Sequence, residues 1–422
     1  MILMRKKIIV KAPILSRSGY GEQSRFALRA LRSREDLFDI FLINIPWGKT
    51  GTIANNSEER QWIEKTLIKT GKYARQAAQF GGDPFDISLQ ITIPVEFEPI
   101  APINIGYTAG IETNKVAASW ISKSNEVVNK IITISEHSKN VLEKTRYDIK
   151  NNETGEEIKN WGLQVPVDVV NYPVLKHTPE PLDLKLVTDK NFLVVSQWGP
   201  RKNLERTIRW FVEEYKDRED VGLIIKANTL SDSIMDREYT SGRLHNLLEG
   251  FEDKKCKVYL VHGEISSGQL TWLYQHPTTK ALINIAHGEG YGLPMFEAAY
   301  NGLPLVTLTW SGQMDFICKQ NKKGKKVPLV VRVDYDLQKV HKEVVWKEVI
   351  EEDSMWAYAR EASYKRAIRE VLTKEVHFKK KALELQKHIL KNFTEEKLYS
   401  DFVNCLSVGP AETAEDNQVF IL

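Results

Sequence analysis

The sequence has few cysteines. Only three occur among its 422 residues, Cys256, Cys318 and Cys405, and they are far apart. None stands in a C-x-x-C pair or at a Cys/His spacing that would indicate a zinc site. The pattern favours neither structural zinc nor a disulfide framework, and it is typical of a protein of the reducing cytosol.

Long hydrophobic runs are also missing. No apolar stretch approaches the roughly 20 residues that a membrane-spanning helix needs. Residues 1–7 are too short and too quickly charged for a secretory signal. We therefore expect a cytoplasmic protein, and the residues leave a peripheral contact with a membrane surface open.

Neither sign of charge dominates. The 59 Lys and Arg against 56 Asp and Glu leave a net charge of +3 at pH 7. Such a balance indicates neither nucleic acid nor an anionic membrane as the main partner. With 42% hydrophobic and 27% charged residues the chain resembles an ordinary globular enzyme, and its length favours two domains. The oligomeric state is left open by these features.

What the sequence does contain is a dense glycine motif within residues 281–317. An apolar run of strand length, 281–286, leads into Gly288, Gly290 and Gly292, which let the backbone turn tightly and approach a ligand.

A short helix follows this turn. Pro294 suits its first turn, and Asn301-Gly302 suits its end before a second strand at 304–309. The N-terminus of such a helix points out of the carboxyl edge of a parallel sheet, where phosphates commonly bind.

Two acids flank that helix end, Glu289 in the turn and Glu297 on the helix. A lone helical glutamate is usually a solvated residue, so the hypothesis of a functional site depends on the surrounding glycines. In that hypothesis both carboxylates face one polyhydroxylated ligand from different sides.

The string EGYGLPMFEA followed by NGLPLV resembles the E-x7-E signature of retaining nucleotide-sugar glycosyltransferases with the GT-B fold. The signature fixes two acids, two glycines, a proline and a downstream Gly-x-Pro at one spacing. The resemblance implies an α/β fold with two facing, doubly wound, Rossmann-like parallel-sheet domains and a cleft between them. It also implies transfer of a sugar from a UDP- or GDP-sugar to a glycan, lipid or small-molecule acceptor, with retention of configuration.

The same resemblance implies the roles of the motif residues. Glu289 would reach the transferred sugar, and Glu297 would accept hydrogen bonds from the ribose hydroxyls. The diphosphate would be bound by the turn and the first helical residue, Gly290, Tyr291, Gly292 and Leu293.

The chain begins with a strand, glycine loop and helix. A buried strand at 7–12 is followed by a loop at 16–24, which resembles the family's loop facing the donor diphosphate. That likeness gives Gly19, Tyr20 and Gly21 a donor-binding role.

Two other kinds of nucleotide-binding motif, the dinucleotide fingerprint and the P-loop, are disfavoured in this region. The loop is not the full dinucleotide fingerprint, and the strand at 38–44 ends in Asn44 where an acid would bind a ribose. Gly48-Lys49-Thr50 imitates the end of a P-loop, but Ile43 stands where the leading glycine should be.

Further strands are expected at 86–93, 103–108, 130–135 and 167–172, separated by helices. They complete a first, acceptor-side domain over residues 1–175. A helical, locally basic segment at 57–80 is most simply a solvated face, with contact to a lipid or polyanionic acceptor as the alternative.

The family commonly places a His-Asp pair at the end of the strand at 103–108. This chain has Thr108 and Glu112 there, so Glu112 is the catalytic candidate. His137 lies in the cap and first turn of a helix, where a histidine is more often structural.

Residues 176–190 read as an interdomain linker and 191–390 as the nucleotide-sugar-binding domain. Helices are expected at 346–372 and 378–390, and a surface loop at 319–326. Residues 391–408 resemble the terminal helix that crosses back to the first domain, and 409–422 should be frayed.

The second domain opens with a strand at 192–196 and an anion-binding corner formed by Arg201, Lys202 and Asn203. Lys202 matches the family's lysine. Gln197 stands where the family has an arginine, and Arg201 compensates for it in this interpretation.

Two further strands contribute donor-binding candidates. Lys226 lies in an apolar strand at 221–227, and it either meets the diphosphate or extends to solvent. The strand at 257–262 leads to Gly263, Glu264 and Ile265, whose backbone would read the nucleobase.

The resulting hypothesis takes Glu289, Lys202 and Glu112 as catalytic. Basic side chains and a helix dipole would stabilise the leaving diphosphate, so neither a metal nor a cofactor beyond the nucleotide sugar is needed. The alternatives are a GT-B epimerase or phosphorylase, and a sugar-nucleotide-binding protein without turnover.

Overall fold

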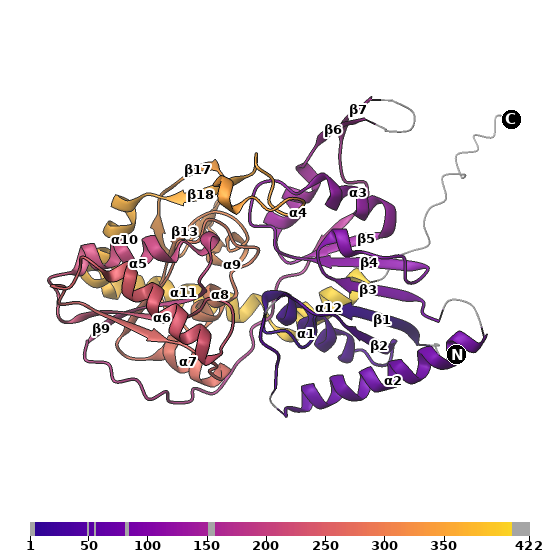
Figure 1. Cartoon of the computed structure of the whole chain (residues 1–422), viewed down its shortest axis with the longest axis horizontal. Helices are drawn as coiled ribbons and strands as arrows, with labels where there is room; N and C mark the ends of the chain where they lie inside the picture. The colour runs from indigo at the N-terminus through magenta and orange to yellow at the C-terminus, as the bar shows by residue number, and fades with distance from the viewer. Residues whose placement is uncertain (1–4, 49, 55, 81–83, 151–156, 407–422) are drawn as a thin grey trace.

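The computed structural model describes residues 5–48, 50–54, 56–80, 84–150 and 157–406. Two six-stranded sheets form its framework, and in Figure 1 they lie side by side, the N-terminal one in indigo and purple. The strands of the first are β1 (Lys6–Ala12), β2 (Phe38–Asn44), β3 (Ile87–Ile91), β4 (Ile103–Thr108), β5 (Lys130–Thr133) and β8 (Val167–Val169). Those of the second are β9 (Lys190–Gln197), β10 (Val221–Asn228), β11 (Lys257–Val261), β12 (Thr279–Asn284), β13 (Leu305–Leu308) and β16 (Val331–Val333).

Every pairing within the two sheets is parallel. The first sheet has the order β2-β1-β3-β4-β5-β8 and the second β11-β10-β9-β12-β13-β16. In the second sheet the order reverses between β9 and β12, and ligands of open α/β sheets bind outside the carboxyl ends of the strands at such a reversal. The predicted α/β class with two doubly wound parallel sheets is confirmed.

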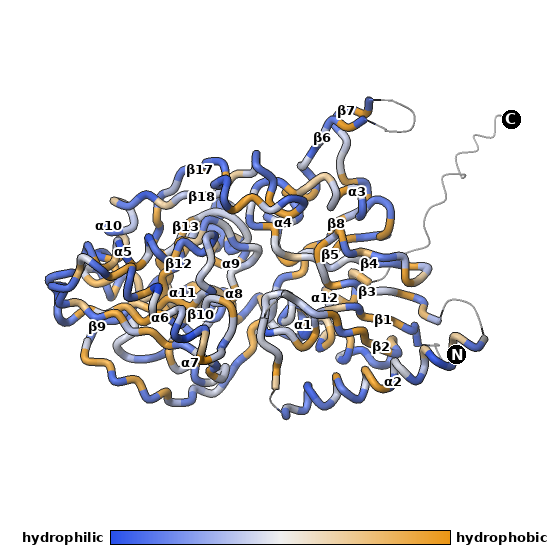
Figure 2. The backbone as a smooth tube through the Cα atoms, viewed as in Figure 1, coloured by the Kyte–Doolittle hydropathy of each residue, from blue (hydrophilic) through white to orange (hydrophobic). Residues whose placement is uncertain are grey.

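Helices cover both sheets. Those of the first half are α1 (Gly19–Arg32), α2 (Glu58–Phe80), α3 (Ala118–Val127) and α4 (Glu136–Lys144). Those that follow are α5 (Leu204–Tyr215), α6 (Ile234–Leu248), α7 (Ser267–Gln275), α8 (Leu293–Tyr300), α9 (Met314–Ile317), α10 (Glu361–Thr373), α11 (Glu375–Asn392) and α12 (Glu395–Cys405). Short 3-10 turns occur at η1 (Pro94–Glu96), η2 (Pro200–Lys202) and η3 (Lys342–Val344). Because central strands are buried on both faces, many of their residues are apolar, and these appear orange in Figure 2.

The largest apolar cluster spans both halves. The rings of Tyr172 and Tyr291 lie 5.1 Å apart between centroids and join the first half to the second. The last helix, α12, lies against α1 in the N-terminal half (Figure 1), where the ring of Phe402 is 5.4 Å from Phe26 and 5.1 Å from Tyr107. The exact domain bounds predicted from the sequence stay predictions, and the tail at 409–422 lies outside the described residues.

The prediction of one helix over 346–372 is wrong. Its second part is α10, but its first part is a bridged turn followed by β18 (Met355–Ala359), which pairs antiparallel with β17 (Tyr335–Lys339). The aromatic residues Trp356 and Tyr358 favour a strand, and pairing with β17 overrides the helical spacing.

Two shorter hairpins were not predicted. β6 (Tyr147–Lys150) pairs with β7 (Glu157–Trp161), and β14 (Cys318–Gln320) pairs with β15 (Lys326–Pro328) across the expected surface loop. Within the described ranges, no helix is both long enough and apolar enough to cross a membrane.

Candidate functional site

The carboxyl end of β12 holds Glu289 in a buried turn, with 5% of the residue exposed. Its carboxylate accepts two hydrogen bonds from Lys202 Nζ, at 2.7 and 2.8 Å, and one from Arg201 Nη1 at 3.0 Å. Asn284 Nδ2 donates a fourth at 3.1 Å. Burial alone would raise the pKa of this carboxyl, but the charges of Lys202 and Arg201 outweigh burial and hold the pKa at about 2. Glu289 is therefore ionised at neutral pH.

Arg201 and Lys202 come from the corner that follows β9. Asn203 ends η2 in the left-handed conformation, with φ of 53°, and its Nδ2 donates to the carbonyl of Ile285 at 3.2 Å. His287 N donates to the carbonyl of Arg201 at 2.8 Å. The ends of β9 and β12, which flank the reversal of strand order, are thus joined by hydrogen bonds.

Arg201 also reaches across to the first half. Its Nη2 lies 3.0 Å from Glu112 Oε1, and Glu112 belongs to the segment after β4. Burial raises the pKa of Glu112, and Arg201 offsets part of that increase. The structure therefore brings the three predicted catalytic residues, Glu289, Lys202 and Glu112, into one cluster around Arg201. Their catalytic roles stay predictions.

The glycines of the motif permit close backbone approaches. A Cβ at Gly288 would lie 2.0 Å from the carbonyl oxygen of Glu112. A Cβ at Gly312 would lie 1.9 Å from the carbonyl oxygen of Gly290. Glycine is required at both positions for the Glu289 turn to meet its neighbours.

Ser311 supports the same turn and was not identified from the sequence. Its Oγ accepts a hydrogen bond from Glu289 N at 3.0 Å, and Gly312 N donates to the carbonyl of Glu289 at 2.9 Å. Ser311 has φ of 67°, a conformation that costs energy for a residue other than glycine. The available signal was a Ser-Gly pair that begins three residues after the end of β13, at the same sheet edge.

The N-terminus of α8 lies next to Glu289. Gly292 has φ of 93°, and α8 begins at Leu293, so its positive end adjoins the turn. The ring of Tyr291 is buried against Tyr172 and Phe296, which leaves only the backbone of Tyr291 for a ligand. The donor-binding roles of Gly290, Tyr291, Gly292 and Leu293 stay predictions.

Glu297 accepts a hydrogen bond from Tyr274 OH at 2.9 Å. Burial raises the pKa of Glu297 to about 7, with Tyr274 opposing the shift and Glu22 adding to it. Its carboxyl is therefore half protonated near neutral pH in the absence of ligand.

This pKa predicts a pH-dependent donor affinity. Ribose hydroxyls would donate to the ionised carboxylate of Glu297, so binding would favour the charged form. Affinity for the nucleotide sugar should rise with pH up to about 7 and level off above it. Calorimetric titration across this pH range measures it, with Glu297→Gln as the variant that should lose the dependence. The same slope in Glu297→Gln would contradict the assignment.

Lys226 and the turn after β11 are in contact. Lys226 Nζ donates to the carbonyl of Gly263 at 2.8 Å, and burial lowers the pKa of Lys226. The carboxylate of Glu264 pairs with Arg17 of the first half, while Ile265 packs on the main core. Lys226 thus meets a backbone carbonyl, and its predicted contact with the diphosphate, like base recognition at 263–265, stays a prediction.

The expected glycine loop at 16–24 differs from the structure. Gly19, Tyr20 and Gly21 form the first turn of α1, because Ser18 caps the helix by accepting from Gly21 N at 3.1 Å. The side chain of Tyr20 is buried, and its hydroxyl donates to the carbonyl of Ala109 at 2.7 Å. Donor binding by these three residues stays a prediction.

At the end of β4, where the resembled family commonly has a His-Asp pair, this chain makes other contacts. Thr108 Oγ1 lies 3.0 Å from Tyr20 OH, and His137 Nε2 donates to the carbonyl of Thr113 at 3.0 Å. Burial lowers the pKa of His137 to about 4, so the ring is neutral at neutral pH. His137 therefore supports the segment next to Glu112.

Helix α2 carries the predicted basic face. Lys69 pairs with Asp39, and Arg60 pairs with Glu64, whereas Ile68 is 61% exposed. Contact of this face with a lipid or a polyanionic acceptor stays a prediction. In the part of the chain that the structure describes, no three His, Cys, Asp or Glu residues cluster in a way that could hold a metal ion.

None of the known protein-family models matches this chain. Two curated proteins, both named serotype-specific mannosyltransferase WbdA from Escherichia coli, are 26% identical to it over 194 residues. That stretch is 44% of this chain and 22% and 21% of the two relatives, so the chain spans about a fifth of their length.

Solved structures match almost the whole chain. Sucrose-phosphate synthase from Thermosynechococcus elongatus has a TM-score of 0.59 at 12% identity, covering 95% of this chain and 98% of its own. A UDP-forming α,α-trehalose-phosphate synthase from Burkholderia xenovorans has a TM-score of 0.56 at 11% identity, covering 96% and 99%. An Escherichia coli trehalose-6-phosphate structure bound with UDP-2-fluoro glucose has a TM-score of 0.54 at 11% identity, covering 95% and 98%. At these identities the likeness establishes the fold alone.

Proposed function

We propose that this chain, which has the GT-B fold, is a glycosyltransferase that moves a sugar from a nucleoside-diphosphate sugar to an acceptor with retention of configuration. The observation that carries the proposal is the ionic cluster of Glu289, Lys202, Arg201 and Glu112. It lies at the reversal of strand order in the second sheet, where such sheets bind nucleotides.

The chemistry of the cluster suits departure of a diphosphate. When the bond between the anomeric carbon and the phosphate oxygen breaks, negative charge develops on that oxygen. Lys202 and Arg201 can stabilise this charge, because Lys202 retains a third N–H and Arg201 carries five in all. The positive end of α8 adds to the same field.

The two carboxylates then have separate tasks. Glu289 would accept hydrogen bonds from hydroxyls of the transferred sugar. Glu112 approaches from the first half, where the acceptor is expected, and its raised pKa suits a group that exchanges a proton with an acceptor hydroxyl.

The relatives suggest which donors to try. The curated relatives are named mannosyltransferases, and one structural neighbour holds UDP-2-fluoro glucose. The panel therefore contains GDP-mannose and UDP-glucose, each with mannosyl, glucosyl and lipid-linked acceptors.

The proposal expects release of a nucleoside diphosphate together with a glycosylated product from one donor. Mass spectrometry and coupled nucleotide detection measure both. An epimerised sugar, phosphorolysis of a glycan, or binding without turnover across the panel would contradict the proposal in favour of an epimerase, a phosphorylase or a binding protein.

A further inference from the structure

Strand β18 makes an unexpected connection to the Glu289 turn. Ala357 N donates to the carbonyl of His287 at 2.9 Å, and His287 Nδ1 lies 2.8 Å from the carbonyl of Ala357. Because a carbonyl only accepts, Nδ1 carries the proton of the ring. His287 is thereby held to β18 through both its backbone and its side chain.

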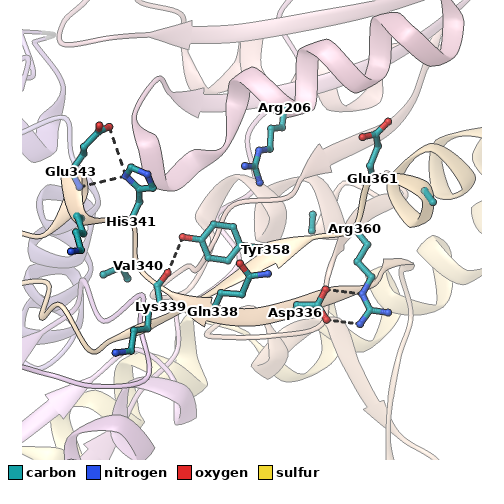
Figure 3. Close-up of a pocket in the computed structure, with 13 residues that line it drawn as sticks. Arg206, Asp336, Gln338, Lys339, Val340, His341, Glu343, Tyr358, Arg360 and Glu361 are labelled. Carbon is teal, nitrogen blue, oxygen red and sulfur yellow. Dashed lines mark hydrogen bonds and ion pairs between the residues drawn. The ribbon is translucent and has the colours of Figure 1, made fainter.

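Aromatic rings enclose this histidine. The His287 ring stacks on Trp356, with centroids 5.1 Å apart and planes at 11°, and it lies 4.4 Å from Tyr358. Figure 3 shows Tyr358 and Arg206 among the residues that line a pocket next to the β17–β18 hairpin. Burial lowers the pKa of His287 to about 4, and Arg206 and Arg201 add to the decrease, so the ring is neutral at neutral pH.

His287 also contacts the basic corner. Its N–H donates to the carbonyl of Arg201 at 2.8 Å, while Arg201 Nη1 donates to the carbonyl of Gly288 at 2.7 Å. His287 is two residues before Glu289. One buried residue therefore contacts β18 through its ring and its carbonyl and the corner through its backbone N–H, next to the turn that carries the carboxylate.

The other end of the hairpin reaches the first half of the chain. Residues 340–354 connect β17 to β18. Met355, the first residue of β18, donates its N–H to Asn114 Oδ1 at 2.7 Å, and Asp353 pairs with Lys115 at 2.6 Å.

These contacts form a closed ring. Asn114 accepts a hydrogen bond from the start of β18, and β18 is hydrogen-bonded to His287. His287 is hydrogen-bonded to Arg201, and Arg201 pairs with Glu112, two residues before Asn114. Displacement of the segment at 112–115 would therefore move the Glu289 turn by two routes.

We propose that His287 is a positioning residue for sugar transfer, which transmits the placement of the Glu112 segment through β18 to Arg201 and Glu289. The inference rests on the proposed function. It assigns a role to a residue outside the E-x7-E pattern. It also implies that the β17–β18 hairpin helps to set the distance between the carboxylates of Glu112 and Glu289.

Three variants test the positioning role. His287→Phe keeps an aromatic ring but loses the Nδ1 donor, and we expect kcat to fall between about tenfold and about a hundredfold with little change in affinity for the nucleoside diphosphate. His287→Asn retains a donor at the position of Nδ1 and should restore most of kcat. His276→Phe is the matched control, because among the described residues the ring of His276 hydrogen-bonds only Thr278, and the variant should leave kcat unchanged.

A readout independent of turnover uses Asn114→Ala, which removes the hydrogen bond between Asn114 Oδ1 and Met355 N. Hydrogen exchange of residues 285–291 should become faster in this variant while the melting temperature stays close to that of the wild type. Unchanged exchange there would overturn the inference, and so would wild-type kcat in His287→Phe. Absence of transfer by the wild type would count against the proposed function, and the exchange measurement would still decide the role of His287.

Discussion

Replacement of Lys202 by alanine should abolish most of the activity. Lys202 donates to both oxygens of Glu289, and we propose that it also meets the leaving diphosphate. Loss of one preorganised donor to a developing anion costs about 10² to 10³ in turnover. The affinity for a nucleoside diphosphate should also fall by about 1.5–3 kcal/mol, the usual contribution of a hydrogen bond to a charged group. Steady-state kinetics and calorimetry measure the two effects.

Lys365→Ala is the matched control for this variant. Lys365 is also a partly buried lysine that bonds two carboxylates, those of Glu213 and Glu361, but it lies on α10 and bonds no residue of the proposed site. Its replacement should leave donor affinity and turnover unchanged. If Lys202→Ala bound the nucleoside diphosphate as tightly as the wild type, the assignment of Lys202 would be wrong.

The second large effect separates the two glutamates. Glu289→Gln removes a charge that Lys202 and Arg201 hold ionised, and the two cations remain available to the diphosphate. We expect this variant to keep its affinity for the bare nucleoside diphosphate while turnover falls. The loss of an acceptor for a sugar hydroxyl corresponds to about 1.5–3 kcal/mol, or about tenfold to about a hundredfold.

Glu297→Gln should behave differently. Glu297 lies on α8 beside Tyr274, on the side of the helix assigned to the nucleoside, so its loss should weaken bare diphosphate and full donor alike. Titration of both variants with both ligands distinguishes the roles. Weak diphosphate binding by Glu289→Gln together with normal binding by Glu297→Gln would show that the roles are reversed.

The fold was predictable because it depends on local patterns. Strands of parallel sheets are rich in apolar residues, so β1, β2, β9 and β10 were predicted within two residues of their observed ends. Structural similarity then confirmed the GT-B prediction. The start of α8 was also predictable from neighbouring residues, because Pro294 lies in the first turn of that helix.

Features that depend on tertiary contacts were not predictable. Residues 355–359 have a spacing compatible with a helix, and only pairing with β17 makes them a strand. The support of Glu289 by Ser311 and the pairing of Glu112 with Arg201 join residues far apart in the chain. The first turn of α1 replaced a loop because the Ser18 cap begins the helix earlier than the glycines suggested.

The configuration of the product tests the central claim most directly. With the donor identified by the panel, proton NMR of the purified product reports the configuration at the transferred anomeric carbon. A retaining transferase yields a product with the configuration of the donor, at a rate that Lys202→Ala lowers and Lys365→Ala does not. A product of inverted configuration, or equal rates in the two lysine variants, would contradict the account.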